Sequence, residues 1–166
     1  MGFNVGDVVY LNSNPEIMMT VSLVFKTEDV YRCGDKFFKE IIKSLGFSVG
    51  DDIIQCSWFN IYENIIEYSV HHFKPKMLKI KSVCTKRPSF KAGDRVCLKS
   101  NPEFPINVSM VLKTEDLYRL DRKIIKKVVQ ELGSFDDGDI QCTWFDKLDN
   151  EYVERFFKAE MLVKIA

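Results

Sequence analysis

The sequence contains no long apolar run and few cysteines. No stretch approaches the roughly 20 consecutive apolar residues that a membrane-spanning helix needs, so we expect no membrane association. The five cysteines are an odd number without Cys-x-x-Cys spacing, which argues against a disulfide framework and against a zinc site. The chain begins Met-Gly-Phe-Asn-Val-Gly-Asp, without the basic and apolar regions of a signal peptide. We therefore expect a cytoplasmic protein with reduced thiols.

Net charge and catalytic motifs are also lacking. The 24 basic residues balance the 24 acidic ones, so the whole chain has no electrostatic field that would attract nucleic acid. No Gly-rich phosphate loop, Ser-His-Asp ordering or His-Glu-x-x-His motif is present. The two histidines, His71 and His72, are adjacent, and neighbouring strand residues point to opposite faces. We expect no enzyme, no cofactor and no metal ion, and a structural or surface role for both histidines.

What the chain does contain is an internal duplication. Phe3–Glu16 is similar to Phe90–Glu103, and the similarity continues through Cys-x-Trp-Phe segments to a final Met-Leu pair. In a chain of 166 residues, each half is close to the lower size limit for a self-sufficient core, so we expect the halves to pack on each other. The predicted domains are residues 1–82 and 90–166, joined by a linker at 83–89.

Each half is predicted to begin with a β-hairpin. Arg95 must face water, so the two-residue alternation of a strand places Val96 inside, with Val9 as its equivalent in the first half. The segments Ser13–Glu16 and Ser100–Glu103 contain Asn-Pro, which favours a tight turn between the first two strands.

An amphipathic helix is predicted after each hairpin. In the second half, apolar residues recur at three- and four-residue steps as far as Gly133, and Thr114 is a suitable N-cap, which predicts a helix from about 115 to 132. The first half predicts a helix from about 36 to 45, with an apolar stripe formed by Phe37, Phe38, Ile41, Ile42 and Leu45. Strands with Cys and Trp on one face follow each helix. The predicted fold class is α+β, mainly β, with two tandem SH3-like small β-barrels that each carry an inserted amphipathic helix.

The shared pattern also resembles a known family. Both halves contain Phe-x-x-Gly-Asp-x-Val-x-Leu-x-Ser, then Cys-x-Trp-Phe, then Phe-x-x-x-x-Leu. This combination resembles the YodC-like family of small, functionally uncharacterised bacterial proteins. The first half carries it at Phe3, Gly6, Asp7, Val9, Leu11, Ser13, Met19, Thr20, Val21, Cys56, Trp58, Phe59, Phe73 and Leu78. The second half carries it at Phe90, Gly93, Asp94, Val96, Leu98, Ser100, Val108, Cys142, Trp144, Phe145, Phe157 and Leu162. The family has Ser-Gly-Gly-Pro where this chain has Ser-Asn-Pro-Glu, and the helical stretch is an insertion, so the resemblance supports the fold and implies no activity.

Aromatic residues form the first candidate binding surface. Small barrels commonly bind peptides or bases on exposed aromatic rings, and we expect Phe59 and Phe145 at the rim of each barrel. Tyr10 should point outward because it alternates with inward-facing neighbours. Trp58 and Trp144 either fill the cores or extend the same surface. On this hypothesis Tyr10, Phe59 and Phe145 contact the partner, and replacing either Phe by Ala leaves the fold intact.

A basic segment is the second candidate. From Phe73 to Gly93 the chain contains no acidic residue. The segment either contacts phosphates or acidic partners, or it is a solvated linker, since its counterpart in the second half is neutral. Its cations are Lys74, Lys76, Lys79, Lys81, Lys86, Arg87 and Lys91.

The sequence as a whole favours a non-enzymatic interaction module that binds a protein or peptide. We expect a monomer whose halves are related by a pseudo-two-fold axis, or a weak dimer. The alternative is a nucleic-acid-binding protein that uses the basic segment 74–91. A third hypothesis is an enzyme that uses Asp7 and Asp94 as paired carboxylates, although Gly-Asp before a strand is also typical of a turn.

Overall fold

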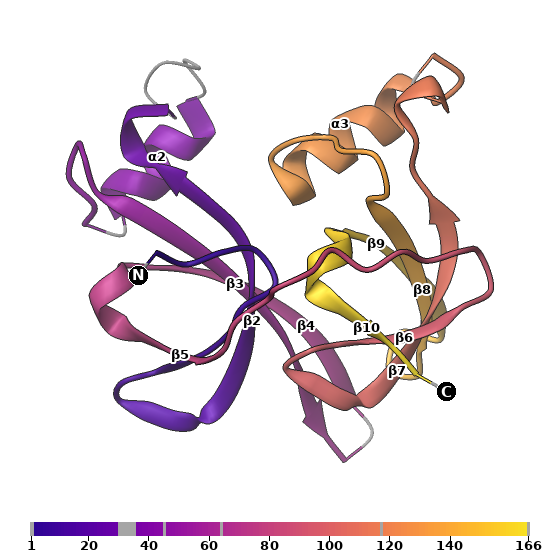
Figure 1. Ribbon diagram of the computed structural model, residues 1–166, viewed down its shortest axis with the longest axis horizontal. Coiled ribbons are helices and arrows are strands. Elements are labelled where there is room, and N and C mark those ends of the chain that lie inside the picture. Colours follow the sequence, from indigo (N-terminus) through magenta and orange to yellow (C-terminus); the bar gives the residue numbers. More distant parts are fainter. Residues whose placement is uncertain (1, 30–35, 45, 64, 117, 166) are drawn as a thin grey trace.

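The computed structural model describes residues 2–29, 36–44, 46–63, 65–116 and 118–165. Figure 1 shows two sheets side by side, and each sheet carries one helix at the same end. The N-terminus lies in the first half and the C-terminus in the second. Within the described residues, no helix is long and apolar enough to cross a membrane.

The first half is a five-stranded antiparallel sheet in the order β4-β3-β2-β1-β5. Helix α2 (Lys36–Ser44) lies between β2 and β3, and a one-turn 3₁₀ helix (Pro75–Met77) precedes β5. The strands are β1 (Val8–Leu11), β2 (Asn14–Lys26), β3 (Asp52–Tyr62), β4 (Ile65–Phe73) and β5 (Leu78–Ser82).

The second half repeats this arrangement strand for strand, in the order β10-β6-β7-β8-β9. Helix α3 (Arg122–Leu132) lies between β7 and β8, and a one-turn 3₁₀ helix (Ala159–Met161) precedes β10. The strands are β6 (Arg95–Leu98), β7 (Asn101–Val111), β8 (Ile140–Asp146), β9 (Glu151–Phe157) and β10 (Leu162–Lys164).

Both sheets are open. Among the described strands, β4 and β5 have one hydrogen-bonded neighbour each, as do β9 and β10, so neither half closes into the predicted barrel. The mainly β, α+β class is confirmed, with two similar sheets. The alternation predicted for the first strands holds only in part: Val9, Val96 and Leu98 are buried and Arg95 is exposed as predicted, but Val8 and Cys97, on the face predicted to point outward, are buried as well.

The hairpin turn in each half lies earlier than predicted. Leu11 pairs with Asn14, so the turn consists of the two residues between them, and Leu98 pairs with Asn101 in the same way. The tight turn predicted over Ser-Asn-Pro-Glu is therefore wrong. Each Pro is the second residue of its strand, beside a shift in register, and prolines are found in strands where the ladder is interrupted.

The predicted start of the second helix is wrong. Residues Thr114–Asp116 form a single 3₁₀ turn, and α3 begins only at Arg122. Asp121 is the N-cap, since its carboxylate accepts an N–H from the first turn at 2.9 Å. Thr114, the predicted cap, instead donates its hydroxyl to the carboxylate of Asp137. The helix ends as predicted, at a left-handed Gly133.

The first helix agrees with the predicted range of about 36 to 45, since α2 spans Lys36–Ser44. Ile42 is buried against Phe47 and Ile53 beneath the helix. Leu45 and the side chains of Phe37, Phe38 and Ile41 lie outside the described residues.

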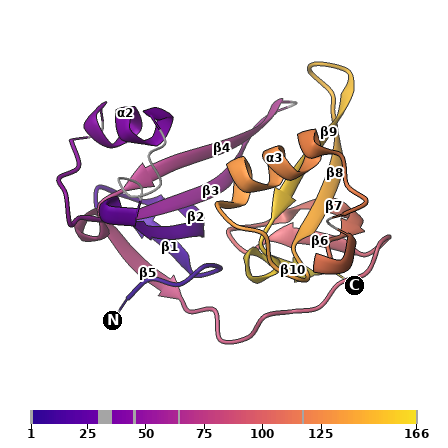
Figure 2. The same cartoon turned by 90° about the horizontal axis from the view of Figure 1, so that it is seen from above.

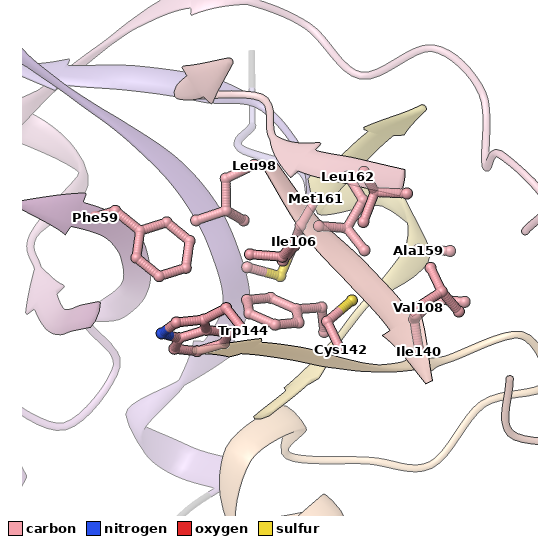
Figure 3. Close-up of a cluster of buried hydrophobic side chains, with 12 residues drawn as sticks. Phe59, Leu98, Ile106, Val108, Ile140, Cys142, Trp144, Ala159, Met161 and Leu162 are labelled. Carbon is pink, nitrogen blue, oxygen red and sulfur yellow. The ribbon is translucent and has the colours of Figure 1, made fainter. Parts of the chain in front are cut away.

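Each sheet has its own hydrophobic core. The first contains Val9, Met19, Val21, Ile54, Cys56 and Leu78. The second, shown in Figure 3, contains Val96, Leu98, Ile106, Val108, Ile140, Cys142, Trp144, Phe157, Ala159, Met161 and Leu162. It also contains Phe59, which comes from the first half. The core of the second half is therefore completed by a residue of the first half.

Candidate functional site

Phe59 lies between the two halves and is only 3% exposed. Its ring centroid is 4.6 Å from that of Phe104 and 5.2 Å from that of Trp144, both in the second half. Figure 3 shows Phe59 beside Trp144. Its backbone N–H donates to Asn101 Oδ1 at 2.9 Å, and Asn101 Nδ2 donates to the Phe59 carbonyl at 3.0 Å. The structure contradicts the prediction of an exposed Phe59, and this ring is not available to an external partner.

Phe145, the equivalent of Phe59, is 42% exposed at the end of β8. Tyr152 lies opposite it on β9, with ring centroids 5.2 Å apart in an edge-to-face arrangement. Leu148 between the two strands is also exposed. Tyr152 and Leu148 could not be recognised from the repeat alone, because their place beside Phe145 depends on the β8–β9 register.

Tyr10 and the tryptophans have intermediate positions. Tyr10 is half-buried, with Met18 and Lys79 opposite it on the neighbouring strands. Trp144 is buried in the second core, whereas Trp58 is half-buried against the first. The Trp58 ring stacks on His71 with centroids 5.3 Å apart. Trp144 therefore belongs to a core, as one of the two alternatives expected, whereas Trp58 borders the surface.

Polar contacts also join the halves. The hydroxyl of Thr20 donates to Ser100 Oγ at 2.9 Å, and the Ser100 N–H donates to Thr20 Oγ1 at 3.1 Å. A Cβ atom on Gly6 would lie 2.1 Å from the carbonyl oxygen of Glu160. The backbone of the first half thus touches the second half directly at Gly6.

Asp7 and Asp94 belong to a turn that occurs four times. The pattern Phe-x-x-Gly-Asp begins at Phe3, Phe47, Phe90 and Phe135, before β1, β3, β6 and β8. In each turn the Gly has φ between +85° and +92°. Each Asp carboxylate accepts the N–H three residues earlier, at 2.9 to 3.0 Å. Only the two turns at Asp7 and Asp94 were expected from the duplication. In all four turns, the Gly and the Asp hold the backbone in the conformation that leads into the next strand.

The second oxygen of each predicted catalytic carboxylate is also engaged, by a different segment in each case. Asp7 Oδ1 accepts the N–H of Cys84 at 2.7 Å. Asp94 Oδ1 accepts from Lys164 Nζ at 2.7 Å, and this bond holds the pKa of Asp94 below its usual value. The two carboxylates share no partner among the described contacts, so they do not form a catalytic pair there.

Two cations of the basic segment have structural partners. Lys74 Nζ lies 3.4 Å from Asp51 and donates to the Gly46 carbonyl at 2.8 Å. Arg87 lies 3.2 Å from the buried Asp139 and 3.4 Å from Glu160. The structure describes Lys76, Lys79, Lys81, Lys86 and Lys91 as exposed and gives them no ion pair. The predicted basic stripe is therefore shorter than the sequence implies.

Lys158, the equivalent of Lys74, is a buried cation. Its Nζ lies 2.6 Å from Asp136 and 2.9 Å from Asp139. The bond from Lys158 lowers the pKa of Asp136, whereas burial raises the pKa of Asp139 in spite of the same cation. Both halves thus tie the residue after the β4 or β9 Phe to a Gly-Asp turn, loosely in the first half and tightly in the second.

Histidines and cysteines form no reactive group within the described residues. His72 bonds Gln55 at 3.1 Å, and burial lowers the pKa of His72. Burial raises the pKa of the Cys56 and Cys142 thiols, which favours the neutral form. No three His, Cys, Asp or Glu side chains in the described part of the chain are grouped to hold a metal ion. Cys33 lies outside the described residues.

The hollows on the described surface are shallow. One of about 400 Å³ is lined by residues that include Phe3, Phe25, Ile54 and Asp52. It brings together apolar side chains with carboxylates and a lysine but no nucleophile beside a base. Searches of family models, curated proteins and solved structures found no match to this chain.

Proposed function

We propose that the protein is a non-enzymatic interaction module that binds a protein partner through the β8–β9 hairpin. The surface consists of Phe145, Leu148 and Tyr152, all of them exposed. Figure 2 draws this hairpin projecting from the second half, on the side away from the segment that joins the halves. An exposed edge-to-face aromatic pair provides a large apolar area at a low cost in side-chain entropy.

The observation that carries the proposal is the position of the equivalent pair in the first half, Phe59 and Tyr68. Phe59 and Tyr68 occupy the same register on β3 and β4, with ring centroids 5.3 Å apart. That pair is packed against the core of the neighbouring half. The same pair on β8 and β9 has the chemistry to bind a protein surface, and it belongs to none of the hydrophobic clusters of the described residues.

The unit architecture is part of the proposal. We propose that each half is an SH3-like unit and a relative of the YodC-like proteins, opened between β4 and β5 in the first half and between β9 and β10 in the second. Support comes from the five-strand order, the one-turn 3₁₀ helix before the last strand, and the shared Phe-x-x-Gly-Asp and Cys-x-Trp-Phe segments. We also propose a cytoplasmic location, which the scarcity of cysteines in paired spacings favours.

Site-specific crosslinking tests the binding surface. A photoreactive p-benzoylphenylalanine in place of Phe145 should give discrete crosslinked products in an extract of the native cells. The same residue in place of Tyr118, which is 95% exposed and distant in sequence from the hairpin, is the matched control. Equal products from both positions, or none from position 145, would count against the proposed surface.

A nucleic-acid-binding role is the second candidate, because five lysines between Lys76 and Lys91 are exposed. Two of them, Lys79 and Lys81, lie on the edge strand β5, where lysines also serve to prevent strand pairing between molecules. The role predicts binding to mixed oligonucleotides at low salt that falls steeply as salt rises, and that weakens when Lys79, Lys81 and Lys86 are neutralised. Absence of binding at low salt would remove it.

A further inference from the structure

The contacts between the halves are one-sided. We call Gly6, Thr20, Leu23, Phe59 and Tyr68 of the first half the docking face, and the residues they meet in the second half the receiving face. The receiving face consists of Ser100, Asn101, Phe104, Gly133, Trp144, Phe157 and Glu160. The ring contact of Phe59 with Trp144 has no reciprocal between Phe145 and Trp58 among the described ring contacts. A two-fold arrangement would pair each contact with its reciprocal, so the expected pseudo-two-fold relation does not describe these contacts.

The second half has its own docking face, and within the described residues it is uncovered except at Met110, which packs against the cluster beneath α3. The equivalents of the five residues are Gly93, Asn107, Met110, Phe145 and Tyr152. Gly6 lies against Glu160, whereas Gly93 has open space where a Cβ would point. Phe59 is buried, whereas Phe145 is exposed and Tyr152 is 76% exposed.

The first half likewise has an uncovered receiving face. Its members include Ser13, Asn14, Ile17, Trp58 and Lys76, the equivalents of Ser100, Asn101, Phe104, Trp144 and Glu160. The difference is clearest beside Lys76, where Met77 is 44% exposed and its equivalent Met161 is 1% exposed. In Figure 1 the 3₁₀ helix before β5 lies at the outer left edge, whereas the yellow one before β10 faces the first half.

A contact of this kind does not close on itself. Each half has one docking face and one receiving face, and the single contact within the chain uses only one of each. Repetition of such a heterologous contact between molecules gives a ring or an open chain. We propose that copies of this protein associate head to tail, with the Phe145 face of one copy on the Trp58 face of the next. The proposal rests on the proposed function and names its partner as a second copy.

The hydrogen-bonding groups of the internal contact have equivalents on the two uncovered faces. Phe59 pairs with Tyr68 in a register that leaves its N–H and C=O for Asn101. Phe145 pairs with Tyr152 in the same register, beyond the last residue of β8 that pairs with β7. Asn14 of the next copy is the equivalent acceptor and donor, and its described bond is to the exposed N–H of Glu16.

Charge also favours this partner. Between Phe145 and Tyr152, the tip of the β8–β9 hairpin carries Asp146, Asp149 and Glu151 against a single Lys147. On the receiving face of the first half, the exposed Lys76 replaces Glu160. Lys76 thus gives the receiving face of the first half a cation for the acidic docking face of the second half, which favours this association over association of the docking face with itself.

A complementation experiment tests the association. The docking variant Phe145→Ser/Tyr152→Ser and the receiving variant Ile17→Ser/Met77→Ser change exposed residues on one face each. By sedimentation velocity, the wild type should form species heavier than 19.4 kDa whose share rises with concentration. Each variant alone should stay a monomer, and an equimolar mixture should form a dimer and nothing larger, because only one pair of intact faces is present. Tyr118→Ser should behave as the wild type.

Three results would overturn the proposal: a wild type that is monomeric at all attainable concentrations, variants that assemble as the wild type does, or a mixture that stays monomeric. If the receiving variant loses its native circular dichroism, the exposed Lys76→Glu tests the same face by charge reversal and should also prevent assembly. A monomeric wild type that still gives specific crosslinks from position 145 to another protein would refute head-to-tail association alone. Failure of the crosslinking as well would refute the proposed function.

Discussion

At the scale of single residues, the duplication provides matched pairs that differ in environment alone. Gly6 and Gly93 both have φ near +90°, a conformation that L-residues with a side chain rarely adopt. Gly6 faces the backbone of Glu160, whereas Gly93 faces open space. Gly93 is therefore needed for its positive φ alone, whereas Gly6 is needed both for its positive φ and for the close approach of Glu160.

Gly6→Ala should destabilise the protein much more than Gly93→Ala. Both substitutions place a side chain in a left-handed conformation, at about 1–2 kcal/mol. Gly6→Ala also requires the backbones of the two halves to separate, since its Cβ would lie 2.1 Å from the Glu160 carbonyl oxygen. We expect a loss of about 4 kcal/mol or more in the free energy of unfolding, measured with urea. Equal losses at both positions would show that the halves do not approach each other at Gly6.

Lys158 and Lys74 are a second matched pair. Lys158→Met leaves the buried Asp139 without its nearest cation and should cost about 3–5 kcal/mol at pH 7. Lys74→Met should cost about 0–1 kcal/mol, because both Lys74 and Asp51 are about one-third exposed. Comparable losses in the two variants would contradict a buried ion cluster in the second half.

The loss in Lys158→Met should shrink as pH falls. In the wild type the bond from Lys158 lowers the pKa of Asp136, so this carboxylate stabilises the fold above its unfolded pKa of about 3.9 and less as pH falls through the lower folded value. The raised pKa of Asp139 acts in the opposite direction, as its contribution decreases while pH rises through the folded value. Without Lys158 both carboxylates are easier to protonate, so the gap between variant and wild type should narrow between pH 7 and pH 3 in urea unfolding. A gap that is constant with pH would indicate lost packing instead of lost charge.

At the scale of elements, the repeat predicted the strands and their order. The start of the second helix and the position of the hairpin turns depend on contacts that the sequence does not show. Val9 and Val96 are buried, as predicted, but so are their neighbours Val8 and Cys97, so a strict two-residue period does not describe these strands. Thr114 was misassigned as a cap because its nearest acceptor, Asp137, lies on a loop whose position the sequence does not give. The Asn-Pro pair suggests a turn locally, but pairing of Leu11 with Asn14 places the turn two residues earlier.

The cap assignment has a direct test in Asp121→Ala. Asp121 satisfies an N–H of the first turn of α3, so its removal should cost about 1 kcal/mol. Glu115→Ala changes an acid inside the originally predicted helix, where its partner Lys113 is exposed, and should change stability by less than about 0.5 kcal/mol. The reverse order in thermal unfolding would favour a helix that begins near residue 115.

At the scale of the whole molecule, the position of Phe59 could not be predicted from the repeat. A residue type that occurs in both halves is expected to have the same structural role in each. Phe59 and Phe145 do share their strand position and their Tyr partner. The burial of Phe59 instead depends on which face of one unit meets which face of the other. Relations between repeats leave no local pattern in the sequence, so the same motif becomes core in one half and surface in the other.

The coupling between the halves leads to a final prediction for Asn101. Its side chain satisfies both the N–H and the C=O of the buried Phe59, and Asn101→Ala leaves two buried polar groups unpaired, at about 2–4 kcal/mol. Asn14→Ala, at the equivalent place, removes one exposed bond in the first half and should cost less than about 1 kcal/mol. Because Phe59 belongs to the second core, the wild type should unfold in a single calorimetric transition, whereas Asn101→Ala should broaden or divide it. Two separate transitions in the wild type, or identical effects of the two substitutions, would mean that the halves fold independently and that the contact through Phe59 adds nothing to either core.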